Sequence, residues 1–116
     1  NLINVATITP VMAAGAVTTS RASIVDVAAD KVAKVNSLII ANIDGANAAD
    51  ITVEVSVDNG SNYVAIAKTV SVAADSSLIV VGKDNGFYLD ETDILAVTAS
   101  AASDLTYLVS YELMTD

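Results

Sequence analysis

Three residue types are missing from this sequence, and their absence excludes several kinds of chemistry. The 116 residues contain no cysteine, no histidine and no tryptophan. Without cysteine and histidine there is no thiol nucleophile, no Ser-His-Asp triad, no zinc site of the usual Cys/His kind and no disulfide bond. The five glycines are isolated, so a glycine-rich phosphate loop is missing too. We therefore expect no catalytic residues, no cofactor, no small-molecule substrate and no enzyme activity.

Basic residues are also scarce. Five Lys and Arg stand against fourteen Asp and Glu, which gives a formal net charge of −9. Because proteins bind nucleic acids largely by neutralising phosphates with Lys and Arg, DNA and RNA are not expected partners. Long apolar runs are absent as well: segments such as 38–41 and 78–81 are far shorter than the ~20 residues of a spanning helix, so no membrane is expected. Residues 1–10 also lack the pattern of a signal peptide.

The apolar residues that are present favour strands. Hydrophobic residues make up 53% of the chain, and the β-branched types that dominate its patterned segments fit a pleated, half-buried surface. Segment 51–57 alternates, with an apolar residue at every odd position, which places four aliphatic side chains on one face of a strand. Segment 105–113 alternates in the same way, and Leu108 is the exception on its polar face.

Four more strands and three turns complete the prediction. Continuous apolar runs at 35–43 and 78–81 predict strands covered on both faces. Segments 63–72 and 94–99 are also predicted strands, and Lys68 interrupts the first of them. The pairs Asp44-Gly45, Asn59-Gly60 and Asn85-Gly86 tolerate positive φ at little cost and predict turns. Strands and turns spaced at roughly 8 to 12 residues indicate an all-β fold, a single-domain antiparallel β-sandwich or jelly roll.

Two segments have more than one interpretation. Residues 27–35 form either a short helix or a turn leading into the next strand, and we favour the turn. Residues 1–22 show little periodicity, so they form either an irregular first strand or an N-terminal arm that becomes ordered on a neighbour. The β-sandwich domain is expected to comprise residues 23–116.

Two acidic segments are candidate metal sites. Asp90, Glu91 and Asp93 place three carboxylates in four residues, and hard oxygen ligands suit calcium. A solvated acidic turn explains the same residues, and we favour it, so no metal is expected. Loop 58–62 lacks the ligand order of an EF-hand and is predicted to be a hairpin. Paired carboxylates could also serve glycoside hydrolysis, but the chain offers few aromatic residues to line a sugar cleft.

From about residue 35 to 112, some two thirds of the chain, the order of short sequence features resembles small structural proteins of tailed bacteriophage virions, especially those of marine phages. The matching stretches are Val35-Asn36-Ser37-Leu38, Ala41-Asn42-Ile43-Asp44-Gly45, the strand that begins near Tyr63, Asp75-Ser76-Ser77-Leu78, Tyr88-Leu89-Asp90-Glu91, Val97-Thr98-Ala99-Ser100-Ala101 and Ser110-Tyr111-Glu112.

The resemblance implies a β-sandwich or jelly-roll module on the particle, either as a capsid decoration protein or as a tail-associated one. Its partners would be the major capsid protein, other virion proteins or further copies of itself, which makes a homo-oligomer the expectation. One departure is visible, because such proteins often read Glu-Gly-Asp where this chain has Glu91-Thr92-Asp93. Threonine disfavours positive φ, so the turn there is expected to differ in geometry.

The charge bears on where such a module would sit. Packaged DNA repels an acidic protein, so we expect the capsid exterior, where the module would act as a cement protein through apolar contacts and strand edges. The alternatives are a tail- or fibre-associated virion protein, a carbohydrate-binding adhesive β-sandwich whose sugar contact would use Tyr88, and a calcium-stabilised surface-layer or fibre module.

Overall fold

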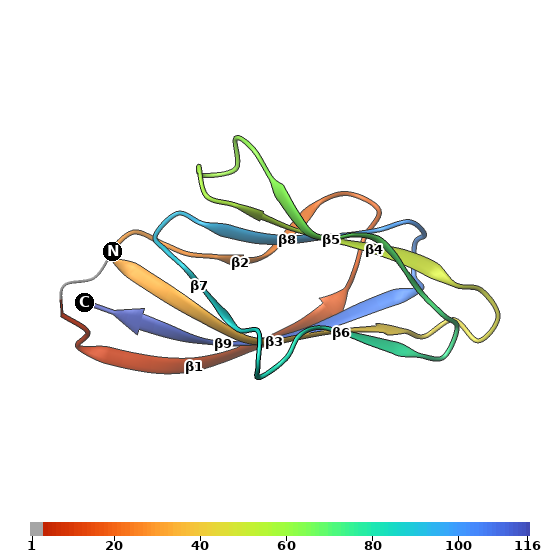
Figure 1. Ribbon diagram of the computed structural model, residues 1–116, viewed down its shortest axis with the longest axis horizontal. Coiled ribbons are helices and arrows are strands. Elements are labelled where there is room, and N and C mark those ends of the chain that lie inside the picture. Colours follow the sequence, from red (N-terminus) through yellow and green to blue (C-terminus); the bar gives the residue numbers. More distant parts are fainter. Residues whose placement is uncertain (1–3) are drawn as a thin grey trace.

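Residues 4–116, which the computed structural model describes, form nine strands in two layers and contain no helix (Figure 1). The predicted all-β, single-domain antiparallel sandwich is confirmed. The strands are β1 (Thr7–Ala16), β2 (Ala22–Asp26), β3 (Lys31–Asn42), β4 (Ala49–Ser56), β5 (Val64–Val72), β6 (Ser77–Val81), β7 (Phe87–Leu89), β8 (Ile94–Ala99) and β9 (Leu105–Thr115).

Every pairing between neighbouring strands is antiparallel. One sheet, called sheet A, has the order β1-β9-β3-β6, and the short strand β7 also pairs with β3. The other, sheet B, has the order β2-β8-β4-β5. The last strand of the sequence, β9, therefore lies between β1 and β3. It pairs with β1 over ten residue pairs without a bulge.

The core lies between the two sheets and is built from alternate residues of the long strands. Ile51 and Val53 of the predicted strand 51–57 are fully buried, as the alternation indicated. From sheet A, Leu38 and Ile40 of β3 meet them in the same hydrophobic cluster. Aliphatic side chains of both sheets thus pack against one another between the layers.

The structure shows what is formed by each of the two segments that had more than one interpretation. Residues 29 and 30 form a turn, and β3 begins at Lys31, so segment 27–35 contains no helix. Segment 1–22 contains β1, in which each residue from Thr7 to Ala16 has a partner in β9. Its residues 1–3 lie outside the described part of the chain.

One expectation about coverage is wrong. The apolar runs at 35–43 and 78–81 predicted strands covered on both faces, but only their inward faces are covered by residues 4–116. Ile39 of β3 pairs with Ile79 of β6, both point away from the core, and Ile79 is 66% exposed. The apolar run is present because the outer face of sheet A is itself apolar.

Left-handed backbone conformations occur mainly at residues other than glycine. Of the three predicted turn pairs, only Asn59-Gly60 has positive φ, at 58° and 87°. Thr92 also adopts positive φ, at 66°, in a turn closed by a hydrogen bond from the Asp93 N–H to the Asp90 carbonyl. Thr92 therefore adopts the left-handed conformation that glycine favours, and the threonine side chain does not prevent this conformation. The Thr92 N–H donates to the Val27 carbonyl at 2.7 Å, which ties the turn to the end of β2.

Replacing Thr92 with glycine or asparagine is expected to stabilise the protein. A left-handed conformation costs a residue with a Cβ about 1–2 kcal/mol. Glycine avoids this cost, but its larger conformational entropy in the unfolded state offsets part of the gain in stability. We expect Thr92→Gly and Thr92→Asn each to raise the free energy of unfolding by about 0.5–1 kcal/mol in urea denaturation. Thr106→Gly, near the start of β9, should lower the free energy of unfolding, and a loss of stability in both Thr92 variants would contradict the strain.

Candidate functional site

The three calcium candidates lie in the turn between β7 and β8, where hydrogen bonds to backbone N–H groups occupy them. Asp93 accepts from the Asp90 N–H at 2.8 Å, and Asp90 accepts from the Glu91 N–H at 2.9 Å. Glu91 reaches across to the start of β3 and accepts from the Asp30 N–H at 2.8 Å, which lowers the pKa of Glu91. No group of three potential metal-ligating side chains is assembled anywhere in residues 4–116.

Calcium is therefore expected to leave the stability unchanged. The carboxylates of this turn serve as acceptors that hold two loops together, and a cation would compete with those hydrogen bonds. Thermal unfolding in about 5 mM calcium, which exceeds the ~0.1–1 mM dissociation constants of extracellular calcium modules, and in excess chelator should give the same Tm. A rise of several degrees in Tm with calcium would instead support a metal site at this turn.

The second acidic segment forms a closed network in the β4–β5 hairpin. Ser56 is fully buried, and its hydroxyl donates to Asp58 while accepting from the Gly60 N–H at 2.8 Å. The side chain and the backbone N–H of Asn62 both donate to Asp58, and these bonds lower the pKa of Asp58 to about 2. The predicted hairpin is present, and its acid is structural.

The hydrogen bonds to Asp58 predict that the stability of the protein falls in acid. Because the folded-state pKa of Asp58 lies below its unfolded value of about 3.9, its contribution is complete above about pH 5 and is lost as the pH falls towards 2. Asp58→Asn should have a lower urea midpoint than the wild type at pH 7, and the two midpoints should converge near pH 2. A difference between the midpoints that does not change with pH would show that the charge is irrelevant.

A second charged cluster lies on the outer side of sheet B. Arg21 makes two hydrogen bonds to Glu54, at 3.0 and 3.2 Å, and its guanidinium lies 3.9 Å from the centre of the Tyr63 ring. Arg21 therefore covers one face of this ring. Tyr88 is the more accessible aromatic residue, since it is 64% exposed on β7 with Lys34 as its neighbour. The sugar contact suggested for Tyr88 remains a prediction.

The outer face of sheet A is a further candidate surface. Its outward-facing residues line up in rows across the strands, and several of them are aliphatic. One row joins Ala14 of β1, Leu108 of β9, Ile39 of β3 and Ile79 of β6. Leu108, the exception to the alternation of its strand, therefore has apolar neighbours on both sides. We call this surface the sheet A face.

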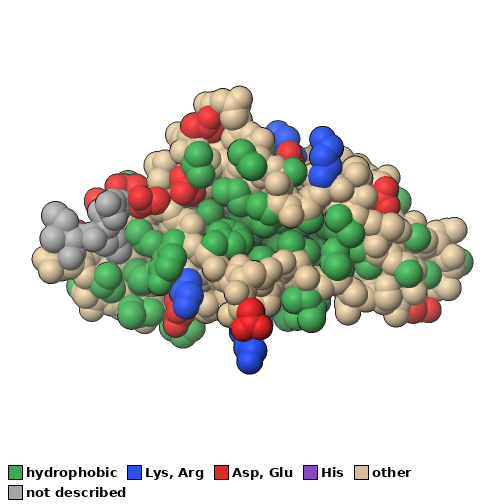
Figure 2. Space-filling view, viewed as in Figure 1, with side chains coloured by type: hydrophobic (Ala, Val, Ile, Leu, Met, Phe, Trp, Pro, Cys, Tyr) green, Lys and Arg blue, Asp and Glu red, His purple; other side chains and the backbone are tan. Residues whose placement is uncertain are grey.

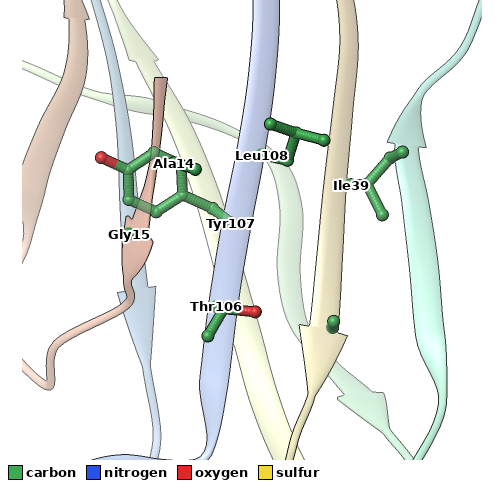
Figure 3. Close-up of a pocket in the computed structure, with 7 residues that line it drawn as sticks. Ala14, Gly15, Ile39, Thr106, Tyr107 and Leu108 are labelled. Atoms are coloured by element: carbon green, nitrogen blue, oxygen red, sulfur yellow. The ribbon is translucent and has the colours of Figure 1, made fainter. Parts of the chain in front are cut away.

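A shallow groove of about 530 Å³ lies on the sheet A face, near the end of β3 and the start of β9 (Figure 3). Small residues lie beside larger ones there, which leaves the hollow. No acidic or basic side chain lines it, so it offers neither a general acid–base pair nor an ion site. The lining residues are Ala14, Gly15, Ile39, Ala41, Thr106, Tyr107 and Leu108.

A second apolar surface follows the edge strand of sheet B. The β4–β5 hairpin projects beyond the layers at the top of Figure 1, and exposed aliphatic side chains occur along it and along β5. In the same orientation, Figure 2 shows hydrophobic side chains at the molecular surface between the two layers as well. We call this surface the β5 edge, comprising Val57, Val64, Ile66 and Val70.

The backbone of β5 is poorly suited to pairing with a further strand. Its register with β4 shifts twice, and Thr69 has a positive φ of 46°. Lys68 adds a charge to the strand. Bulges and lysines are devices that block edge-to-edge pairing, so the backbone of β5 does not favour the addition of a further strand.

Comparisons with known proteins establish the fold and no family. No family model matches the sequence, and no curated protein matches it. A chain from the Bacillus endospore appendages, described as a novel family of disulfide-linked pili, matches with a TM-score of 0.55 at 17% identity, over 94% of this chain and 87% of that one. Two structures of a pentameric capsid protein from metagenomic phage sequences match with a TM-score of 0.41 at 16% identity. They cover 90% of this chain, which spans 60% and 64% of theirs.

The likeness to the appendage chain concerns the fold alone. Cysteine is absent from all 116 residues, so they cannot take part in a disulfide link. The TM-score with the capsid protein is too low to establish a shared fold. Within residues 4–116 no helix has the length and apolar character needed to cross a membrane.

Proposed function

We propose that this protein is a structural, non-enzymatic component of a bacteriophage virion, a decoration or cement protein that binds the capsid exterior. The observation that carries the proposal is the presence of two separate apolar surfaces, the sheet A face and the β5 edge, on one small domain. Monomeric soluble proteins rarely expose large apolar patches, and such patches mark contact surfaces. Two such surfaces allow one copy to contact the particle and another protein at the same time.

Charge supports the exterior location. The net charge of −9 disfavours contact with packaged DNA and favours a surface turned towards solvent. A pilus-forming protein shares the fold, so a tail, fibre or other filament is the alternative setting. We assign the β5 edge to the particle, because it projects from the sandwich on a hairpin that the Ser56 and Asp58 network holds rigid.

Co-sedimentation with purified phage particles from the source of the sequence tests the proposal. The wild-type chain should pellet with the particles, and immunogold labelling should place it on heads rather than tails. Val64→Asp should lose this binding, since it puts a charge on the β5 edge at a side chain that is 65% exposed.

Ile43→Asp provides the matched control, because Ile43 is 62% exposed and lies outside both apolar surfaces. This variant should pellet like the wild type. Failure of the wild-type chain to bind any particle would overturn the proposal, and gold on tails or fibres would move it to the alternative setting.

A further inference from the structure

We propose that two copies of this chain pair through the sheet A face, about a two-fold axis that runs parallel to the strands between β3 and β9. The inference deepens the proposed function, because it names the occupant of a surface that the particle contact leaves free. It rests on the register of the strands, on the charge of the face and on its area.

The register shows what such an axis would bring together. Since β3 and β9 are neighbours in sheet A, a two-fold axis between them places β9 of one copy over β3 of the other, row upon row. Leu108 then lies over Ile39 of the second copy, because these two residues are register partners. Ala14 lies over Ile79 of the second copy in the same row. Each apolar row meets itself.

The charged row is also complementary to itself. Lys34 and Glu112 are register partners, and they are the cation and the anion among the outward-facing residues of β1, β3, β6, β7 and β9. The same axis sets Glu112 over Lys34 of the second copy and repeats this contact by symmetry. The face is therefore neutral in a protein of net charge −9, so all of the excess negative charge lies elsewhere. The face therefore has no excess negative charge that would attract a strongly basic partner.

The area is sufficient for a dimer. Ten paired residues of β1 and β9 extend for about 33 Å at ~3.3 Å per residue, and three to four strands spaced by ~4.8 Å are about 14–19 Å wide. Each copy would thus bury about 500–600 Å², or about 1,000–1,200 Å² in total, which reaches the lower range of specific interfaces. The groove in the face provides room for interlocking side chains.

Sedimentation velocity of the full chain, from about 1 to 300 μM (a range that brackets micromolar affinities), tests the inference. The wild type should shift from monomer to dimer as concentration rises. Ile79→Asp should weaken dimerisation at least tenfold, and Val64→Asp should leave it within about twofold. These two variants are matched, because both place one aspartate at an exposed strand position, at 66% and 65% exposure.

A charge swap tests the axis itself. Lys34→Glu alone should weaken the dimer at least tenfold, because it gathers four carboxylates at the two-fold axis, and combining it with Glu112→Lys should restore the wild-type affinity to within about threefold. The double variant also keeps opposite charges at this register pair within each sheet, and Tm measurements check that all variants fold.

A wild type that stays monomeric throughout the range overturns the inference, as does an equal effect of Ile79→Asp and Val64→Asp. Failure of the double swap to restore the dimer overturns the axis. The proposed function is tested separately: a monomer that pellets with particles refutes only the dimer, and a dimer that binds no particle refutes only the virion role.

Discussion

Replacing Asn42 with leucine is expected to lower the free energy of unfolding by about 3 kcal/mol and the Tm by more than about 10 °C. Asn42 ends β3 in sheet A with its side chain buried at 3% exposure. Its amide donates to the Val72 carbonyl at 2.9 Å and to the Asn47 carbonyl at 3.0 Å, and its oxygen accepts from the Asp44 N–H at 2.9 Å. A leucine fills the same space but leaves these three groups without their partner.

The position of Val72 explains why the effect is large. It ends β5 in sheet B, so this one amide connects the two sheets at one end of the sandwich. Asn42→Asp keeps the acceptor and loses both donors, and it should be about as destabilised at pH 7 and recover partly in acid, where a protonated carboxyl can donate again. Asn47→Ala is the control, since only its carbonyl is used by Asn42. A loss below about 1 kcal/mol for Asn42→Leu would contradict the role assigned to this side chain.

Replacing Gly86 with alanine is expected to cost about 1–3 kcal/mol, because the added methyl group has no space. A Cβ built on Gly86 lies 2.8 Å from the carbonyl oxygen of Val35. Val35 lies at the bulge in the pairing of β3 with β9, which falls between Val35 and Ser37. On its other side, β3 pairs with β7 at the same residue. The backbone would have to move, and the short strand β7 would move with it.

Gly82→Ala is the matched control from the same connection between β6 and β7. A Cβ there makes ordinary contacts, at 3.6 Å from Ile79 and 3.7 Å from Asn85. This variant should be neutral or stabilised by up to about 1 kcal/mol, since alanine reduces the entropy of the unfolded chain. Equal effects of the two substitutions in urea denaturation would show that the close approach of Gly86 to β3 is not what matters.

Strands with one polar face were predictable from the sequence. The alternation in 51–57 and 105–113 corresponds to β4 and β9. Segment 94–99 corresponds to β8, which has no polar face and was predictable from its apolar run instead. β1 was not recognised as a regular strand, because both of its faces are apolar or small: Met12 points outward and Ala13 inward, so no period of two appears. β2 and β7 have five and three residues, too few to show a pattern.

The candidate surfaces could be anticipated only through deviations from the pattern. Leu108 breaks the polar side of its strand and lies on the sheet A face, and Lys68 interrupts the apolar run of the strand that forms the β5 edge. The contact between Glu91 and the backbone of Asp30 joins residues 61 positions apart, and no local pattern indicates such a contact. The sequence therefore predicts a surface rather than a cleft, but not its position.

The place of β9 between β1 and β3 has a consequence for biosynthesis. A nascent chain displays both flanking strands long before the ribosome releases the residues that join them, so sheet A is completed after translation of this region and through contacts remote in sequence. During that interval the edges of β1 and β3 that pair with β9 remain unpaired, and the β1 edge alone offers ten residue pairs. The β9 strand of a neighbouring polypeptide could pair with these edges. Crowded synthesis should thus favour strand-exchanged species, whereas dilute refolding should return closed molecules.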